Sequence, residues 1–191
     1  MNHPTRETYL QAATTHLAPL FAAQGFPLPP VRASVGIPAG GAGGKLKRIG
    51  ECWSNRASAD NTTEIFICPS QSEPVQVLAI LLHELIHAAV GLECGHKGPF
   101  KRVALALGLE GKMTATTPGE QLTRDLATLA ASLGDYPHAA LNTALSGRKK
   151  QGTRMIKLVC DDCGWSCRTA QKNVDAGLPV CHCGGEINVA E

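Results

Sequence analysis

Residues 81–100 read LLHELIHAAVGLECGHKGPF, and in them two histidines and a glutamate interrupt an otherwise apolar helix. His83 and His87 are four residues apart, so on a helix their rings lie on one face, one turn apart. This spacing is typical of two zinc ligands, with Glu84 placed to take a proton from a water that attacks a carbonyl group. The flanking segments AILL and AAV predict a buried helix, in which each unpaired polar group costs about 1–3 kcal/mol. The pattern therefore favours a metal centre over histidines that merely pack in the core.

A third ligand is needed, because catalytic zinc sites usually combine three protein ligands with one open position. Gly91 turns the chain after the helix and brings Glu93, Cys94 and His96 within reach of the two histidines. All three side chains are chemically acceptable ligands. Spacing alone leaves the choice among them open.

The segments HELIHAAVG, GHKGPF and ALALGL together resemble the SprT-like (Spartan-related) metallopeptidase family. The IGECW and EIFICP segments before the helix and the cysteine-rich tail are similar to bacterial and phage members, so the likeness spans roughly residues 30–188. In that family the third zinc ligand is a histidine in a GH…F element, which implies His96 here, four residues before Phe100. The chain departs from the family at Lys97, where glycine is common.

The resemblance implies a zinc-dependent endopeptidase that acts on proteins associated with nucleic acid, with His83, His87 and His96 as zinc ligands and Glu84 as general base. The alternative function is a non-enzymatic nucleic-acid-binding or transcription-associated zinc protein, in which the HExxH site serves only structure. The glutamate favours the enzyme, because a structural zinc has no use for a base and gains from a fourth side-chain ligand. Tyr136 and His138 are possible donors to the oxyanion of the reaction, but the segment that carries them favours a turn with a hydrogen-bonded tyrosine.

Hydrophobic periodicity predicts an α+β fold, which the family resemblance narrows to a zincin-like metallopeptidase domain with a C-terminal zinc ribbon. The strands predict a small antiparallel sheet, and the glycine-rich segment 38–50 predicts a loop or a wide hairpin tip. The expected helices are residues 5–24, 75–91, 99–107 and 119–133, and the expected strands are residues 31–37, 49–53 and 64–68.

The tail contains a second metal-binding pattern. CDDCGWSC at 160–167 and CHCGG at 181–185 supply a CxxC and a CxC pair separated by 17 residues. This spacing resembles a zinc ribbon, in which two knuckles each give two thiolates to one structural zinc. A tail of about 40 residues has too little apolar material to fold without such a site. The expected ligands are Cys160, Cys163, Cys181 and Cys183, and Cys167 and His182 are spare candidates.

The polar segment SGRKKQG, residues 146–152, predicts a boundary between two domains. Residues 1–147 form the expected metallopeptidase domain, and residues 148–191 form a basic linker and the ribbon. The first part holds 11 basic and 11 acidic residues and is neutral. The second begins with a strongly basic stretch.

Residues 148–172 hold seven basic and two acidic residues, a net charge of +5. This run predicts contact with DNA or another nucleic acid, and a solvated linker is the other interpretation. Trp165, Arg168 and Lys172 lie between the knuckles, where an aromatic ring among cations is suited to stacking on a single strand. A tryptophan that caps a small core is the alternative for Trp165.

No secretory signal is visible at the N-terminus, and the longest apolar run near the motif, VLAILL, is far shorter than the roughly 20 residues of a membrane-spanning helix. We therefore expect a cytoplasmic protein. Of the eight cysteines, five lie between positions 160 and 183, which favours metal ligation over disulfides. Cys52, Cys68 and Cys94 are expected to be small buried hydrophobic residues.

Overall fold

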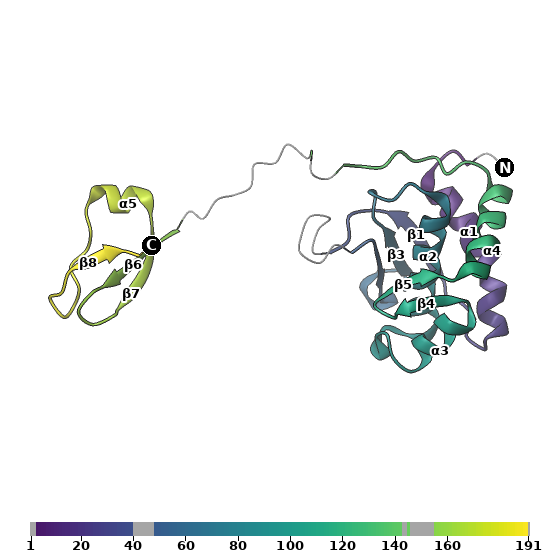
Figure 1. Ribbon diagram of the computed structural model, residues 1–191, viewed down its shortest axis with the longest axis horizontal. Coiled ribbons are helices and arrows are strands. Elements are labelled where there is room, and N and C mark those ends of the chain that lie inside the picture. The colour runs from purple at the N-terminus through teal and green to yellow at the C-terminus, as the bar shows by residue number, and fades with distance from the viewer. Residues whose placement is uncertain (1–2, 40–47, 143–144, 146–154, 191) are drawn as a thin grey trace. The chain divides into compact units, whose positions relative to one another are not determined.

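A computed structural model describes residues 3–39, 48–142, 145 and 155–190 of the 191-residue chain. The chain divides into two compact units, Met1–Ser146 and Gly147–Glu191 (Figure 1). Most of the glycine-rich segment and the basic residues Arg148, Lys149, Lys150 and Arg154 fall outside the described residues, so the structure does not bear on the predictions made for them.

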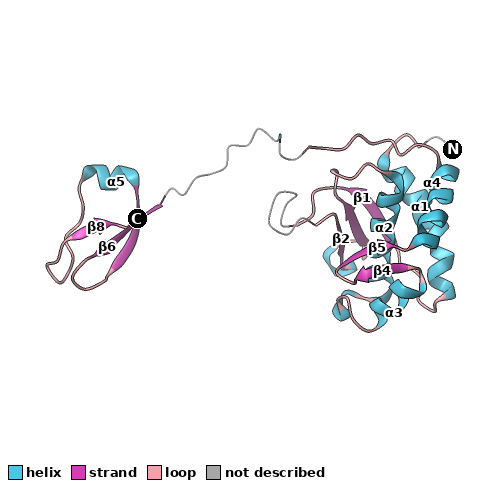
Figure 2. Ribbon diagram, viewed as in Figure 1, coloured by secondary structure: helices cyan, strands magenta, loops and turns pink. Residues whose placement is uncertain are grey.

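The first unit combines helices with two small sheets (Figure 2). Its elements in chain order are α1 (Arg6–Ala23), β1 (Val31–Val35), β2 (Gly50–Trp53), η1 (Asn55–Ala57), β3 (Thr63–Ile67), α2 (Pro74–Val90), η2 (Leu92–Cys94), α3 (Pro99–Ala106), β4 (Leu109–Lys112), β5 (Ala115–Pro118) and α4 (Glu120–Leu133). The four predicted helices and three predicted strands are all present within a few residues of their expected bounds.

The three-stranded sheet has the order β1-β3-β2, and β1 runs parallel to β3 while β2 runs antiparallel to it. The prediction of an antiparallel sheet was therefore wrong. Strand β3 inserts between β1 and β2, and the long connection between those two strands leaves room for it. The alternation of apolar residues reports which face of a strand is buried, but it carries no information on the order of strands.

Helices α1 and α2 cover one face of this sheet. Helix α1 contacts β1, helix α2 contacts β2 and β3, and α4 packs against both helices. Figure 1 shows α1 and α4 beside each other. Each of the first two helices begins at a side-chain cap: Thr5 accepts a hydrogen bond from the backbone N–H of Thr8, and Glu73 accepts from those of Val75 and Gln76. The largest fully buried side chains are Tyr9, Leu10, Phe21, Ile65, Ile67, Leu78, Leu81, Leu82, Leu85, Ile86, Phe100 and Leu109.

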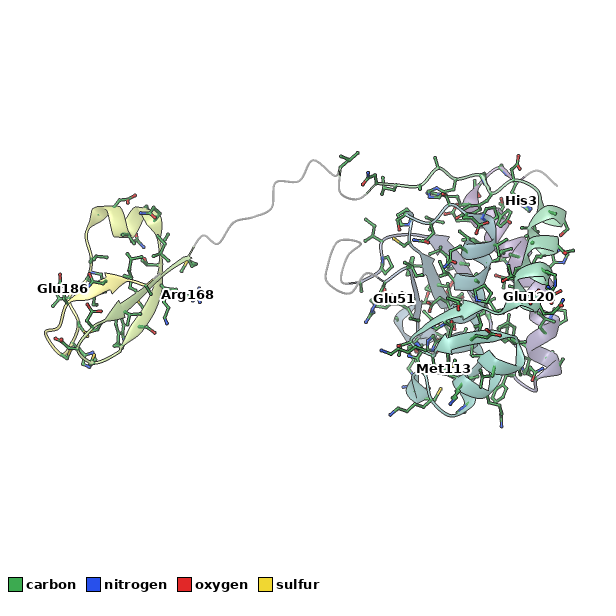
Figure 3. All side chains as sticks on the ribbon, in the orientation of Figure 1. His3, Glu51, Met113, Glu120, Arg168 and Glu186 are labelled. Atoms are coloured by element: carbon green, nitrogen blue, oxygen red, sulfur yellow. The ribbon has the colours of Figure 1, made fainter. Side chains whose placement is uncertain are left out.

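The hairpin of β4 and β5 was not predicted. Its sequence, LEGKMTATTP, has one fully buried apolar residue, Leu109, so it lacks the alternating pattern that signals a strand. Backbone pairing holds it together, with Leu109 opposite Pro118 and Gly111 opposite Thr116. Met113 lies at its turn and is labelled in Figure 3.

The second unit is a three-stranded antiparallel sheet with one short helix. Its elements are β6 (Met155–Cys160), β7 (Ser166–Ala170), α5 (Gln171–Ala176) and β8 (Ile187–Val189), and the strand order is β7-β6-β8. Among the described residues of this unit, the hydrophobic core consists of four buried residues, Leu158, Cys160, Cys181 and Ile187. Two of these four are cysteines of the paired-cysteine pattern, so the small core and the expected metal site coincide. Among the described residues of the whole chain, no helix is long and apolar enough to cross a membrane.

Candidate metal centre

Three histidines converge in the first unit. His83 and His87 lie on α2, and His96 lies in the turn between η2 and α3. The Nε2 atom of His96 is 3.2 Å from Nε2 of His83 and 3.2 Å from Nε2 of His87. The α-helical repeat places the first two rings on one face, and the turn after Gly91 returns the chain so that the third ring meets them.

This geometry fits a tetrahedral zinc ion. Ligand nitrogens at about 2.0–2.1 Å from a zinc ion lie about 3.3 Å apart at tetrahedral angles, close to the separations of the imidazole nitrogens. Burial and the neighbouring His96 lower the pKa of His83 to about 4. Burial and the two neighbouring imidazoles lower the pKa of His87 to about 3. Burial also lowers the pKa of His96. The three rings are therefore neutral at neutral pH, the state in which a histidine binds a metal ion.

Packing holds the rings in place. The Phe100 ring, which is fully buried, lies with its centroid 4.4 Å from that of His87 and 4.9 Å from those of His83 and His96. Its position four residues after His96 places it on the first turn of α3. Phe100 thus forms an apolar support common to all three imidazoles.

The other two candidates for the third ligand are turned away from the histidine group. The carboxylate of Glu93 is exposed and folds back over Gly91. The Sγ atom of Cys94 lies 3.4 Å from the carbonyl oxygen of Gly91. Within the described residues the group that converges consists of His83, His87 and His96 alone.

Glu84 is buried next to the histidines, with 7% of its surface exposed. Burial, with a smaller contribution from the charge of Glu51, raises the pKa of Glu84 to about 8, and the guanidinium of Arg48 opposes the shift. Figure 3 labels Glu51 on β2. Arg48 and Glu51 form an ion pair, and Glu51 also accepts a hydrogen bond of 3.0 Å from the indole of Trp53.

Gly50, the first residue of β2, allows this placement of Glu84. A Cβ atom at position 50 would lie 2.6 Å from Oε1 of Glu84 and 2.6 Å from Cγ2 of Ile80, closer than any van der Waals contact. The backbone of β2 therefore approaches α2 as closely as it does because residue 50 has no side chain.

A cavity of about 620 Å³ opens over the histidines and the glutamate. Its walls come from α2, from β2 and from the β4–β5 hairpin. The lining includes Gly50, Glu51 and Cys52 on one side and Thr114, Ala115 and Thr116 on the other. In the three-stranded sheet β2 is an edge strand, so one wall of the cavity is a strand edge that pairs with no other described strand.

Thr116 contacts the group of three histidines directly. Its Oγ1 lies 2.8 Å from Nδ1 of His83, the ring nitrogen that faces away from the other histidines. No sequence pattern pointed to Thr116, because the contact joins two residues 33 positions apart through an unpredicted hairpin. Gly50 had a weak signal, since a glycine inside a strand pattern often marks a close backbone approach.

Neither candidate oxyanion donor lies at this cavity. The Tyr136 ring packs against Tyr9 of α1, with 5.0 Å between centroids. The Nε2 atom of His138 is 2.7 Å from the carbonyl oxygen of Pro69, and its Nδ1 is 3.2 Å from a guanidinium nitrogen of Arg6. These residues secure the chain after α4 against α1, which agrees with the structural interpretation of this segment and not with a role as oxyanion donors.

A second group of ligand atoms lies in the second unit and comprises Cys160, Cys163, Cys181 and Cys183. The Sγ pairs Cys160–Cys183, Cys163–Cys181 and Cys181–Cys183 are 3.6, 3.5 and 3.5 Å apart. These distances exclude disulfides, whose sulfurs are about 2.05 Å apart, and are close to the roughly 3.8 Å between thiolates on one tetrahedral zinc ion. The spare candidates Cys167 and His182 are outside the group.

Both groups have the donor types of metal sites. Three imidazoles leave an open position, as in catalytic sites, whereas four thiolates close the coordination shell, as in structural sites. Comparisons of the whole chain with protein family models, with curated proteins and with solved structures find no match.

Proposed function

We propose that this protein is a zinc-dependent endopeptidase of the SprT-like type. The observation that carries the proposal is the presence, in one cavity, of three neutral imidazoles at tetrahedral spacing and one buried carboxylate. A site that only had to hold structure would gain from a fourth ligand and would have no need to bury Glu84 unpaired. Imidazole ligands suit zinc as well as copper, iron and nickel, and the resemblance to the SprT-like family favours zinc among these metals.

A zinc ion at the three histidines supplies Lewis acidity, which polarises a carbonyl group and lowers the pKa of water. Glu84 would be kept ionised by a zinc ion bound beside it, in spite of its raised pKa, because the positive charge of the ion stabilises a carboxylate. As a carboxylate, Glu84 accepts the proton of the attacking water while the new C–O bond forms at the peptide carbonyl. Glu84 then gives this proton to the leaving nitrogen as the C–N bond breaks, so that one water is consumed for each bond cleaved. In the low dielectric of the buried site, the electrostatic interactions that accompany both proton transfers are stronger than they are in water.

The walls of the cavity favour an extended peptide as the substrate. Gly50, Glu51 and Cys52 present the edge of β2 to the cavity, and a strand edge offers backbone donors and acceptors to an incoming chain. Such pairing recognises the backbone of a peptide and places a carbonyl group at a repeating interval. A folded substrate would first have to expose a segment of this kind.

The ribbon supports a nucleic-acid partner. Lys157 on β6 and Arg168 on β7 are both exposed and lie directly opposite each other in the sheet. Figure 3 shows Arg168 projecting from the ribbon. Like charges in this register are destabilising unless an anion lies between them, and neither side chain forms an ion pair with a described residue. We infer that this pair contacts phosphates and brings the protease to proteins on DNA.

The same observation favours the second candidate function, a non-enzymatic nucleic-acid-binding zinc protein. In that case the ribbon carries the function and the histidine site only stabilises the first unit. The two functions differ in one measurable property, which is the consequence of losing the Glu84 carboxylate.

The test compares Glu84→Gln with His96→Ala in the full chain. Glu84→Gln is expected to keep the metal content of the wild type and to lose at least about a hundredfold in hydrolysis of an unstructured protein such as casein, assayed with and without DNA. His96→Ala is expected to lower the metal content, measured by mass spectrometry of the purified protein. Full metal occupancy in His96→Ala would transfer the ligand role to Glu93 or Cys94.

Glu93→Gln is the matched control, because it makes the same chemical change at an exposed glutamate outside the histidine group. It should retain both metal and hydrolysis. Equal cleavage by Glu84→Gln and the wild type would refute the protease and leave the binding protein as the better explanation.

A further inference from the structure

The β4–β5 hairpin reaches the metal-ligand group through one side chain. The hydroxyl of Thr116 is 2.8 Å from Nδ1 of His83, whereas Nε2 of the same ring is 3.2 Å from Nε2 of His96. The two nitrogens of His83 therefore face different partners. One faces the shared centre of the three imidazoles, and the other faces the hairpin.

The hairpin holds Thr116 at a defined position. At its base, Leu109 is buried and pairs with Pro118, and the backbone N–H of Gly119 donates a 2.9 Å hydrogen bond to the carbonyl oxygen of Gly108. Gly111, directly opposite Thr116, has a φ of +83°, a value that a residue with a side chain adopts only with strain. Gly111 thus permits the backbone conformation found opposite Thr116, whose hydroxyl lies against His83 of α2.

His83 and His87 are supported differently. The ring of His87 is buried and lies closest to Phe100, and its Nδ1 has no hydrogen-bond partner among the described residues. His83 is more exposed and its ring lies farther from Phe100, at 4.9 Å between centroids. On the side of the ring that faces away from the other histidines, His87 has only packing contacts, whereas His83 has a hydrogen bond there.

We propose that Thr116 is a positioning residue that fixes the tautomer and the ring orientation of His83 for metal binding. The inference rests on the metal centre of the proposed function. A histidine that binds a metal through Nε2 carries its proton on Nδ1, and an oxygen acceptor at Nδ1 favours this tautomer and raises the basicity of Nε2. Thr116 Oγ1 is that acceptor, so the hairpin contributes to metal affinity without supplying a ligand.

Metal affinity of the full-length protein tests the proposal. Thr116→Val keeps the shape of the side chain and removes the acceptor, and it should weaken zinc affinity by about tenfold to a hundredfold in competition with a chromophoric chelator. Thr116→Ser keeps the hydroxyl and should restore the affinity to within about threefold of the wild type. Thr117→Val is the matched control, because Thr117 is the exposed neighbour on the same strand and should leave the affinity unchanged.

Substitution of cobalt for zinc adds a spectroscopic measurement, since the visible absorption of Co²⁺ reports the arrangement of its ligands. Thr116→Val should alter this spectrum at saturating metal, and Thr117→Val should not. The far-UV circular dichroism of the metal-free variants verifies that each is folded, and Thr116→Ala, which removes the acceptor and adds no atoms, replaces Thr116→Val if the latter does not fold.

An affinity of Thr116→Val within twofold of the wild type, or a Thr116→Ser as weak as Thr116→Val, would overturn the proposal. No substrate enters these measurements. An error in the protease assignment would therefore leave the affinities as expected, whereas an error in the role of Thr116 would leave the Glu84-dependent hydrolysis intact.

Discussion

Replacing Gly50 by alanine should separate metal binding from hydrolysis. The added Cβ would lie 2.6 Å from Oε1 of Glu84, and an ordinary contact begins at 3.4 Å, so the carboxylate must move by about 0.8 Å. Oε1 is the end of a flexible side chain, which can turn away at little cost, whereas the three imidazoles pack against Phe100, and two of them also lie on α2. Glu84 should therefore be displaced while the ligands stay.

The magnitude follows from this displacement. A misplacement of about 1 Å in a catalytic group costs on the order of a hundredfold in rate. We expect Gly50→Ala to lower kcat about a hundredfold, with a smaller change in KM and with one metal ion still bound at the histidines. The second close contact, with Cγ2 of Ile80, should destabilise the fold by about 1–3 kcal/mol, measured by urea unfolding.

Two further variants distinguish the effects. Gly36→Ala makes the same change next to the same sheet, where the Cβ would meet only Phe66 at 3.1 Å and where the residue is not part of the cavity wall, so kcat should be retained. Gly50→Ala combined with Ile80→Leu removes the methyl group on Cβ of residue 80 and should recover stability without recovering kcat. Loss of the metal together with the activity, or a kcat within threefold of the wild type, would refute the role given to Gly50.

Two predictions concern the ribbon in the full-length chain. Cys160→Ser should make residues 155–190 sensitive to limited proteolysis even with zinc present, and a chelator should do the same to the wild type, because the four-residue core is too small to fold without the metal. Cys167→Ser, a change outside the thiolate group, should leave these residues resistant. Binding to single-stranded DNA should weaken steeply as the salt concentration rises. Lys157→Ala and Arg168→Ala should each reduce the magnitude of the slope of log K against log salt by about 1. Lys101→Ala on α3 is the control and should leave the slope unchanged. A slope unchanged by both ribbon variants would make the basic run a solvated surface.

The features that sequence predicted well are local ones. The helix that carries His83 and His87 follows from the apolar segments that flank the two histidines, and these segments are local to the site. Within each cysteine pair the two residues are close because a knuckle is a local turn, and the zinc-ribbon spacing predicted that the two pairs meet. The choice of His96 over Glu93 and Cys94 came from family resemblance, since spacing gave no preference among the three.

The features that sequence missed depend on contacts between distant segments. The hairpin is held by backbone hydrogen bonds and one buried side chain, so its residues have no pattern to read. Thr116 reaches His83 only because that hairpin packs beside α2. Tyr136 and His138 failed as candidates for the same reason: their distance in sequence from α2 gave no information on which face of the unit they join.

The incorrect sheet prediction bears on function as well as on fold. In a simple antiparallel meander of three strands the second strand is central, and both of its edges are paired. Because β3 lies between β1 and β2, strand β2 is instead an edge strand. This strand lines the cavity over the histidines. The same arrangement brings the bare backbone of Gly50 against Glu84. Strand order thus determines which strand edge lines the cavity over the histidines and how closely the backbone approaches the buried side chain of Glu84.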